Sequence, residues 1–362
     1  MRGVISTISF MTLISLTVFT APWAPAAAPS SDTKLTLIKV INGDISPKSV
    51  QSSGDGVVSA QNMMYRHSVT IYDATSFELI KTISDSVSLK DFGYSNFPGT
   101  YQGAPVEGAF SPDGKYLYVT NYSMYGTGYT KEGHDTCSPK SGYDKSFLYR
   151  INRATYKIDA IYPVGSVPKV VQVTPDNKYL LVTNWCSYTL TVISISSQKV
   201  IKNIYIGAYP RGIVVAKDSS KAYIAEMGGG TIHVINLRDF STSLIPLGNN
   251  PRAMVLSPDN SMLYVTMNKS GQVASWDLTI NRPGKTVKTG KAARSLAISS
   301  DGTALFAVNY VSGTISKVRT SDMKILQSIP VCKKPIGVTY DSPTRNTWVA
   351  CYSGQIKIFA NK

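Results

Sequence analysis

The stretch from Pro168 to Asn184, PKVVQVTPDNKYLLVTN, decides the fold of this 362-residue chain because it recurs at a nearly constant spacing. Each copy contains a proline (alanine in the copy at 293), usually a basic residue, an apolar strand, a polar turn and a second apolar strand. The clear copies begin 63, 42, 41, 42 and 42 residues apart and occupy residues 105–121, 168–184, 210–226, 251–267, 293–309 and 335–351. The 63-residue interval indicates an insertion, and Pro47-Lys48-Ser49-Val50-Gln51 matches the start of a further copy, which makes seven.

Each copy predicts four antiparallel strands. The first leads into a turn such as Ser111-Pro112-Asp113-Gly114, in which Pro presets φ and Gly accepts a positive φ. A second strand such as Tyr116–Thr120 follows, and Thr189–Ile193 and Lys199–Ile204 are examples of the third and fourth. Four strands in about 42 residues, with no stretch of helical period, describe one propeller blade. We therefore expect an all-β fold, a seven-bladed β-propeller of four-stranded antiparallel blades.

The two ends of the repeat array predict how the ring closes. The seventh copy supplies only three strands, at 336–340, 347–351 and 355–359. The segment Lys34–Val40, before the first copy, has the pattern of a fourth strand. Pairing it with the seventh copy would remove the exposed strand edges that an open array leaves. We expect the ring to be closed by this N-terminal strand.

The repeated block also carries a family resemblance. Tyr118-Val119-Thr120-Asn121, with the variants at 181–184 and 264–266, resembles the YVTN-repeat β-propeller proteins, which are exported bacterial and archaeal seven-bladed propellers. The resemblance covers Lys34 to Lys362 and implies the fold and export of the protein. It implies little about activity, because propellers carry many unrelated functions.

The N-terminal residues have the pattern of a signal peptide. Arg2 is followed by an apolar run over 4–20, and Ala24-Pro25-Ala26 or Ala26-Ala27-Ala28 offers a cleavage site. We expect a signal peptide at 1–26, a propeller domain at 34–362 and a secreted or cell-surface protein with no transmembrane segment after cleavage. An uncleaved anchor is the alternative, which the 17-residue run barely permits.

The four cysteines are interpreted through this expected export. An oxidising compartment favours two disulfides, and four cysteines allow three pairings. Placing the cysteines on the blades brings all of them to one face and favours Cys137 with Cys186 and Cys332 with Cys351. A metal site is the alternative, but no CxxC or close histidine spacing supports it.

On the same face, basic residues recur at one position of the repeat. In five blades a cation stands directly after the repeat proline or the alanine that replaces it, near the mouth of the central channel: Lys48, Lys169, Arg211, Arg252 and Arg294. Such a ring would attract a carboxylate, a phosphate or an acidic polysaccharide. The alternative is that each cation tethers a neighbouring carbonyl or carboxylate and so serves the repeat itself.

Aromatic residues in the loops between second and third strands form a second candidate feature. Tyr122 and Trp185 are expected to add binding surface for a sugar ring or a protein partner. Ordinary packing is the alternative, above all for Trp185 beside a disulfide. The insertion at about 124–146 in the second blade is expected to bind a ligand, because long loops in compact repeats are usually functional or disordered.

Catalysis finds little support in the sequence. Only three histidines occur, His67, His134 and His233, and no haem-attachment, EF-hand or HExxH motif is present. We therefore expect no cofactor and no metal, and favour a non-enzymatic protein. Propellers that resemble this one include lactonases and domains of redox enzymes, so a lactonase-like hydrolase or a redox-associated enzyme is the alternative. The hydrolase would combine Arg211, Arg252 or Arg294 with Glu226 or Glu107.

The net charge of +15 bears on the partner. In an exported protein it favours an anionic cell-wall polymer or an envelope protein, whereas nucleic acid is not expected because no binding motif occurs. The sequence thus predicts a monomeric secreted or envelope-associated binding or scaffold module that uses its insertion-bearing face. A purely structural wall protein without a ligand is a third possibility.

Overall fold

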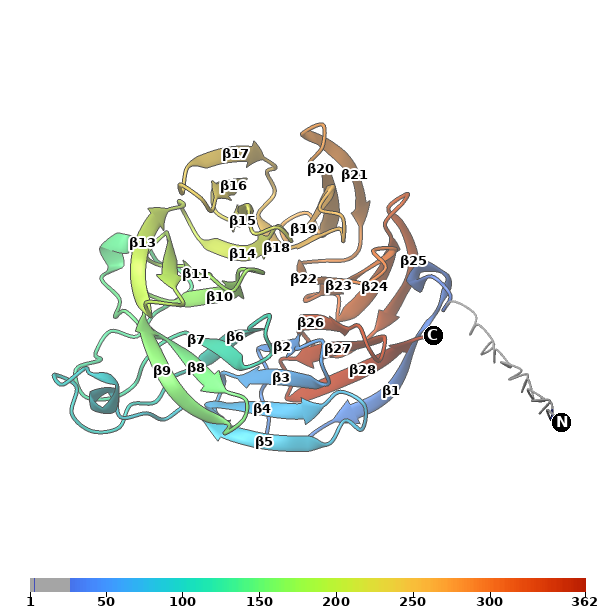
Figure 1. Ribbon diagram of the computed structural model, residues 1–362. Helices are drawn as coiled ribbons and strands as arrows, with labels where there is room; N and C mark the ends of the chain where they lie inside the picture. The colour runs from blue at the N-terminus through green and yellow to red at the C-terminus, as the bar shows by residue number, and fades with distance from the viewer. Residues whose placement is uncertain (1–2, 4–26) are drawn as a thin grey trace.

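The computed structural model describes Gly3 and residues 27–362, and these form a seven-bladed β-propeller (Figure 1). Within this part of the chain, 28 strands make seven four-stranded antiparallel sheets. The first strand of each blade lies at the central channel and the fourth lies at the rim (Figure 1). The predicted fold class is confirmed.

Blades 1 to 7 follow one another along the chain. Blade 1 contains β2 (Ser49–Ser52), β3 (Val57–Asn62), β4 (Ser68–Asp73) and β5 (Leu79–Ser84); blade 2 contains β6 (Pro105–Phe110), β7 (Tyr116–Asn121), β8 (Phe147–Asn152) and β9 (Lys157–Pro163). Blade 3 contains β10 (Pro168–Val173), β11 (Tyr179–Asn184), β12 (Thr189–Ser194) and β13 (Lys199–Tyr205); blade 4 contains β14 (Pro210–Val215), β15 (Lys221–Glu226), β16 (Thr231–Asn236) and β17 (Thr242–Pro246). Blade 5 contains β18 (Pro251–Leu256), β19 (Met262–Met267), β20 (Gln272–Asp277) and β21 (Arg282–Lys288); blade 6 contains β22 (Ala293–Ile298), β23 (Ala304–Asn309), β24 (Thr314–Arg319) and β25 (Lys324–Pro330). Blade 7 contains β26 (Pro335–Asp341), β27 (Asn346–Cys351), β28 (Gln355–Asn361) and β1 (Leu35–Ile41).

The core lies between blades, which explains why the second strands are apolar on both faces. In β11, Leu180 and Val182 pack toward blade 2 against Tyr118, whereas Leu181 packs toward blade 4 against Ile213. All four apolar side chains and Tyr118 are buried. Each blade therefore completes its core with both neighbours, as repeat proteins do.

The turn between first and second strands explains the recurring Asp-Gly and Asp-Asn pairs. Gly114, Asn177 and Gly302 occupy the same repeat position with φ values of 70°, 57° and 70°. Glycine and asparagine tolerate this left-handed conformation best. The preceding aspartate accepts a side-chain hydrogen bond within the turn, as Asp176 does from Thr174 at 2.6 Å.

Strand β1 closes the ring by pairing with β28, from Leu35 opposite Asn361 to Ile41 opposite Ile356. Buried Lys317 of blade 6 reinforces this closure, because its Nζ donates to the Thr33 carbonyl and to Asn361 Oδ1, both at 2.7 Å. The predicted closure by the N-terminal strand is confirmed. The short 3₁₀-helix η1 (Ser30–Asp32) precedes β1. The predicted signal peptide at 1–26 lies outside the described residues except for Gly3.

Two segments interrupt the repeat, and both lie beside blade 2 (Figure 1). One joins β7 to β8 over residues 122–146 and contains the 3₁₀-helix η3 (Pro139–Ser141). The other, between β5 and β6, contains η2 (Leu89–Phe92) and was not foreseen. They support each other, since Gln102 pairs with Tyr125 and the Phe97 and Tyr129 rings stack with centroids 5.6 Å apart.

The predicted disulfides are present. Cys137 in the 122–146 loop is bonded to Cys186 after β11, and Cys332 before β26 is bonded to Cys351 at the end of β27. The first disulfide attaches the loop of blade 2 to blade 3. Across the part of the chain that the structure describes, no helix has the length and apolar character needed to cross a membrane.

Candidate functional site

A pocket of about 710 Å³ lies where the central channel opens on the insertion-bearing face. Side chains or loops from all seven blades line it, because the first strands start there and the second strands end there. Below it the channel narrows to a cavity of about 120 Å³. Arg211, Arg252 and Arg294 line both spaces and therefore form the floor of the pocket. We call this space the mouth pocket.

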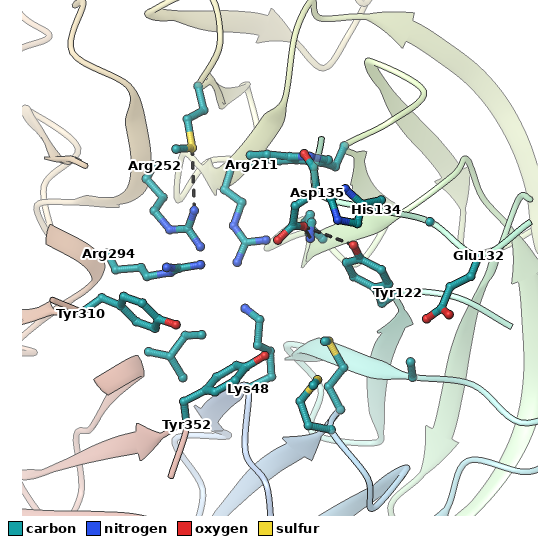
Figure 2. Close-up of a pocket in the computed structure, with 18 of the residues that line it drawn as sticks. Lys48, Tyr122, Glu132, His134, Asp135, Arg211, Arg252, Arg294, Tyr310 and Tyr352 are labelled. Atoms are coloured by element: carbon teal, nitrogen blue, oxygen red, sulfur yellow. Dashed lines mark hydrogen bonds and ion pairs between the residues drawn. The ribbon is translucent and has the colours of Figure 1, made fainter. Parts of the chain in front are cut away.

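The repeat places the five sequence-predicted cations at the mouth pocket. Each stands at or next to the start of a first strand, and successive blades turn this position toward the channel axis. Figure 2 shows the ends of Lys48, Arg211, Arg252 and Arg294 directed toward one another. All five line the pocket, with Lys169 beside Asp135.

Two of the five cations have carboxylate partners. Lys169 Nζ lies 2.9 Å from Asp135 Oδ1, and Arg211 Nη2 lies 3.2 Å from Glu107 Oε1. Burial lowers the pKa of Lys169 to about 7, although the charge of Asp135 acts in the opposite direction. Burial alone would raise the pKa of Asp135, but the nearby Lys169 ammonium holds it below its usual range. Lys169 and Arg211 therefore fit the alternative interpretation of the repeat position, in which the cation contacts a neighbouring carboxylate.

The other three cations make no ion pair with any described residue. Lys48 and Arg252 are each only 6% exposed. The nearest polar contact of the Arg252 guanidinium is Met227 Sδ, 3.7 Å from Nη1. Arg294 lies over the Tyr310 ring at 4.1 Å, and its Nε is buried without a hydrogen-bond partner. These cations therefore leave an excess of positive charge at the pocket floor.

The pKa values of these groups reflect burial and mutual repulsion. Burial lowers the pKa of Lys48 well below its ordinary value, and the Arg211 charge adds to this effect. Burial likewise lowers the pKa of Arg252, and the positive charge of Arg294 lowers it further. Groups that repel one another in this way are favourable only when another interaction compensates.

The aromatic residues have different positions. The Tyr122 ring lies 4.2 Å from Lys169 Nζ, and its hydroxyl donates to Asp135 Oδ1 at 3.3 Å. Trp185 is 8% exposed, stacks on Tyr209 with centroids 4.6 Å apart and donates through Nε1 to the Asp135 carbonyl at 2.9 Å. Trp185 thus mainly fixes the insertion in place, while Tyr122 lies on the pocket wall together with Tyr310 and Tyr352.

One side of the pocket is formed by the insertion, with Glu132 and His134, and by the loop between β3 and β4, with His67. Tyr125 Oη donates to Glu132 Oε1 at 2.5 Å. His67 Nδ1 lies 2.6 Å from the Gly103 carbonyl oxygen. Among the described residues, no hydrogen bond joins His67 to His134, and no group of three or more His, Cys, Asp or Glu could hold a metal ion.

Sequence reasoning missed Asp85, which lies behind this wall. It is 2% exposed, and neither carboxylate oxygen has a hydrogen-bond partner among the described residues. His67 Nδ1 lies 3.8 Å from Asp85 Oδ2. Burial raises the pKa of Asp85 to about 8. The 58-residue interval between Pro47 and Pro105 was the available signal of the extra segment, but not of this burial.

Glu226, considered for a hydrolase, lies outside the mouth pocket lining. Its Oε1 accepts from Ala208 N at 3.1 Å, and its Oε2 accepts from Thr231 and lies 3.2 Å from His233 Nε2. Asn184 makes the equivalent contacts in blade 3, where Gly165 N donates to Oδ1 at 2.9 Å and Nδ2 donates to Thr191 at 2.8 Å. Glu226 therefore replaces the repeat asparagine within its blade, and of the two carboxylates only Glu107 contacts one of the arginines.

Comparison with known proteins agrees with this architecture. Residues 142–221 match the family described as YNCE-like beta-propeller, and residues 249–357 match the Cytochrome D1 heme domain. Antigen Lp49 of Leptospira interrogans serogroup Icterohaemorrhagiae serovar copenhageni (strain Fiocruz L1-130) is 25% identical over 179 residues. These partial matches agree with the resemblance to YVTN-like seven-bladed propellers and with the seven blades of the structure. The chain aligns with the antigen over 45% of its own length and spans 36% of the antigen's length.

Proposed function

We propose that this YVTN-like propeller is a binding module for an anionic ligand, a cell-envelope polymer or a protein partner, and that the mouth pocket is its binding site. The observation that carries the proposal is the set of three cations, Lys48, Arg252 and Arg294, which line the pocket without a carboxylate partner among the described residues. Burying unpaired cations side by side is unfavourable. A bound anion would offset this cost and form charge-assisted hydrogen bonds, each worth roughly 1.5–3 kcal/mol.

The pocket walls support a ligand that also has apolar surface. Tyr122, Tyr310 and Tyr352 line the pocket beside the cations, and Met63 and Met227 add polarisable side chains. Aromatic rings next to charged groups suit sugars or peptide side chains.

A location at the cell surface is part of the proposal. The two disulfides and the antigen relative are compatible with an extracellular or surface protein. Disulfides persist mainly in oxidising compartments. An envelope polymer or an envelope protein would be within reach of a propeller in that location.

One of the matching domains is named for haem, so we compared the lining of the mouth pocket with the side chains that bind haem iron. Residues 249–357 contribute Arg252, Asn268, Arg294, Tyr310, Ile336 and Tyr352 to the mouth pocket. They contribute no histidine or methionine to it, and both cysteines of this span form a disulfide. In the mouth pocket, Tyr310 and Tyr352 are the side chains of the matched span that could coordinate haem iron, whereas His67 and His134 lie outside that span. We derive no haem chemistry for this protein.

The proposed function is tested by equilibrium binding of the oxidised protein from Ala27 onward to an isolated anionic wall polysaccharide, with neutral dextran as the control polymer. We expect binding to the wall polysaccharide that weakens at high salt, because screening reduces attraction between charges. The variant Arg252→Gln/Arg294→Gln should lose this binding, whereas exposed Arg238→Gln should keep it. Absence of binding at low salt, or equal binding by the double variant, would remove the proposal.

A lactonase-like hydrolase is the second candidate, favoured by the ion pair between Arg211 and Glu107. A lactone-hydrolysis assay of the native protein and the Glu107→Gln variant tests it. Hydrolysis that disappears in the variant would support the enzyme. Hydrolysis that is absent in both would remove this candidate and leave the binding function unaffected.

A further inference from the structure

We infer that the mouth pocket recognises a phosphate monoester end-on, carried by a single sugar or by the end of a chain, and does not bind the interior of a polyanion. The inference rests on the proposed anion-binding function and specifies its ligand. Three observations carry it: the convergence of the unpaired cations, the narrowing of the channel below them and the separation of charge across the pocket.

The unpaired cations converge on one region instead of forming a row. Figure 2 shows Lys48, Arg252 and Arg294 pointing inward from three sides of the pocket floor, with Arg211 next to them. After burial, the Arg211, Arg294 and Arg252 charges lower the pKa of Lys48 and the Glu107 carboxylate raises it, so all four groups lie within electrostatic range of the Lys48 ammonium. A polyanion with one charge per unit would be matched by cations spaced along a groove. A compact group with about two negative charges, such as a phosphate monoester near neutral pH, matches a cluster.

The floor of the pocket opens into a much smaller space. The space of about 710 Å³ above the arginines narrows to about 120 Å³ below them. Arg211, Arg252 and Arg294 line both spaces and separate them. A phosphate group at this floor is therefore the deepest part of its ligand, and the rest of the ligand extends toward the open face.

Charge is distributed unequally around the opening. Lys48, Arg252 and Arg294 surround the pocket floor, Asp135 is paired with Lys169, and Glu132 of the insertion lies farther from the cations (Figure 2). A polyanion that crossed the pocket toward the insertion with one anionic group on the floor would place another near Glu132, where it is repelled. A ligand with a single anionic end avoids this repulsion.

The remaining volume accommodates the group that carries the phosphate. Pockets of several hundred Å³ hold ligands larger than an inorganic ion. Tyr310 and Tyr352 lie on one side of the pocket and Tyr122 on the opposite side, so a ring standing on the phosphate would lie between aromatic walls. A sugar phosphate should therefore bind more tightly than inorganic phosphate.

Titration calorimetry with three probes tests the inference. The probes are glucose 6-phosphate, inorganic phosphate, and a glycerol-phosphate polymer whose terminal phosphates have been removed so that only diesters remain. We expect glucose 6-phosphate to bind at least tenfold more tightly than the polymer and more tightly than inorganic phosphate.

The variants Lys48→Met and Arg252→Gln should each weaken glucose 6-phosphate binding at least tenfold, and exposed Lys157→Gln serves as the matched control. Their thermal unfolding is measured in parallel. As a variant that leaves the cation cluster intact, Glu132→Gln should strengthen polymer binding more than glucose 6-phosphate binding, because it removes repulsion from the Glu132 carboxylate.

The outcomes separate this inference from the proposed function. Polymer binding that equals or exceeds glucose 6-phosphate binding would overturn the end-on inference while supporting anion binding. If inorganic phosphate binds as tightly as glucose 6-phosphate, the inference that the pocket also recognises the sugar attached to the phosphate is wrong. If neither these probes nor the wall polysaccharide binds, both the inference and the proposed function are wrong.

Discussion

Lys169 of blade 3 and Asp135 of the blade 2 insertion form an ion pair, with Nζ and Oδ1 2.9 Å apart. The same aspartate accepts from Trp185 through its backbone carbonyl at 2.9 Å. Together with the disulfide between Cys137 and Cys186, these contacts fix the insertion at the edge of the mouth pocket. They also give one cation of the repeat a carboxylate partner, whereas Lys48, Arg252 and Arg294 have none among the described residues.

The first prediction concerns the charge of Lys169. Replacing Asp135 by Asn removes the group that opposes the effect of burial, so the pKa of Lys169 should fall below its value of about 7. Lysine-selective NMR during a pH titration measures this change. Tyr122→Phe is the matched control, because it keeps the carboxylate and should leave the titration nearly unchanged. An unaltered Lys169 titration in Asp135→Asn would contradict the assigned ion pair.

The second prediction concerns the replacement of the repeat asparagine in blade 4. Glu226→Asn and His233→Thr should each destabilise the protein by roughly 1–3 kcal/mol, because each leaves a partly buried polar group without its partner. The double variant recreates the Asn184–Thr191 arrangement of blade 3 and should regain most of the loss. Urea unfolding measures all three. Simple additivity of the two losses would show that Glu226 and His233 are not coupled.

The third prediction concerns ring closure. Lys317→Met should lower the free energy of unfolding by about 2–4 kcal/mol, because it leaves the Thr33 carbonyl and Asn361 Oδ1 without their charged donor. Exposed Lys324→Met in β25 is the control. Hydrogen exchange should be faster in β1 of the variant. Unchanged exchange in β1 and unchanged unfolding would contradict a stabilising role for Lys317.

The fourth prediction concerns Asp85 and pH. Burial raises its pKa from 3.8 to about 8 in the folded protein. Between these values the folded state holds a proton that the unfolded chain has lost, so the contribution of Asp85 to stability decreases as pH rises through this window. Asp85→Asn should remove that decrease and be more stable than the native protein by at least about 1 kcal/mol at pH 9. Parallel stability curves of the two proteins from pH 4 to pH 9 would contradict the pKa shift.

The sequence predicted the propeller, the closing strand and the disulfide pairing because all three follow from a periodic pattern. A repeat of 41 or 42 residues places Cys186 and Cys351 at the same end of their blades, so their partners could be chosen by position. The segment between β5 and β6 was missed because only Pro47 to Gln51 of the first copy were matched to the repeat, although the 58-residue spacing to Pro105 was too long for one copy. A sequence shows where extra segments interrupt a repeat, but it does not show what those segments pack against.

The repeat could not predict which of the five cations have a carboxylate partner. Lys48, Lys169, Arg211, Arg252 and Arg294 occupy equivalent positions, yet only two of them contact a carboxylate. Their partners, Asp135 and Glu107, lie 34 and 104 residues away; Asp135 is in the insertion and Glu107 is in the first strand of blade 2. Pairing across blades depends on the three-dimensional arrangement of loops, which a single sequence does not specify.

The central claim is that Lys48, Arg252 and Arg294 together bind an anion. The most direct measurement is a crystal structure of the protein soaked in selenate, a tetrahedral dianion whose position is given by anomalous scattering. We predict a selenate at the pocket floor within hydrogen-bond distance of Arg252 and Arg294, and no selenate there in Arg252→Gln. A native crystal in which the three cations instead bond to protein carbonyl or carboxylate oxygens, and in which the pocket floor shows no anomalous peak, would contradict the claim.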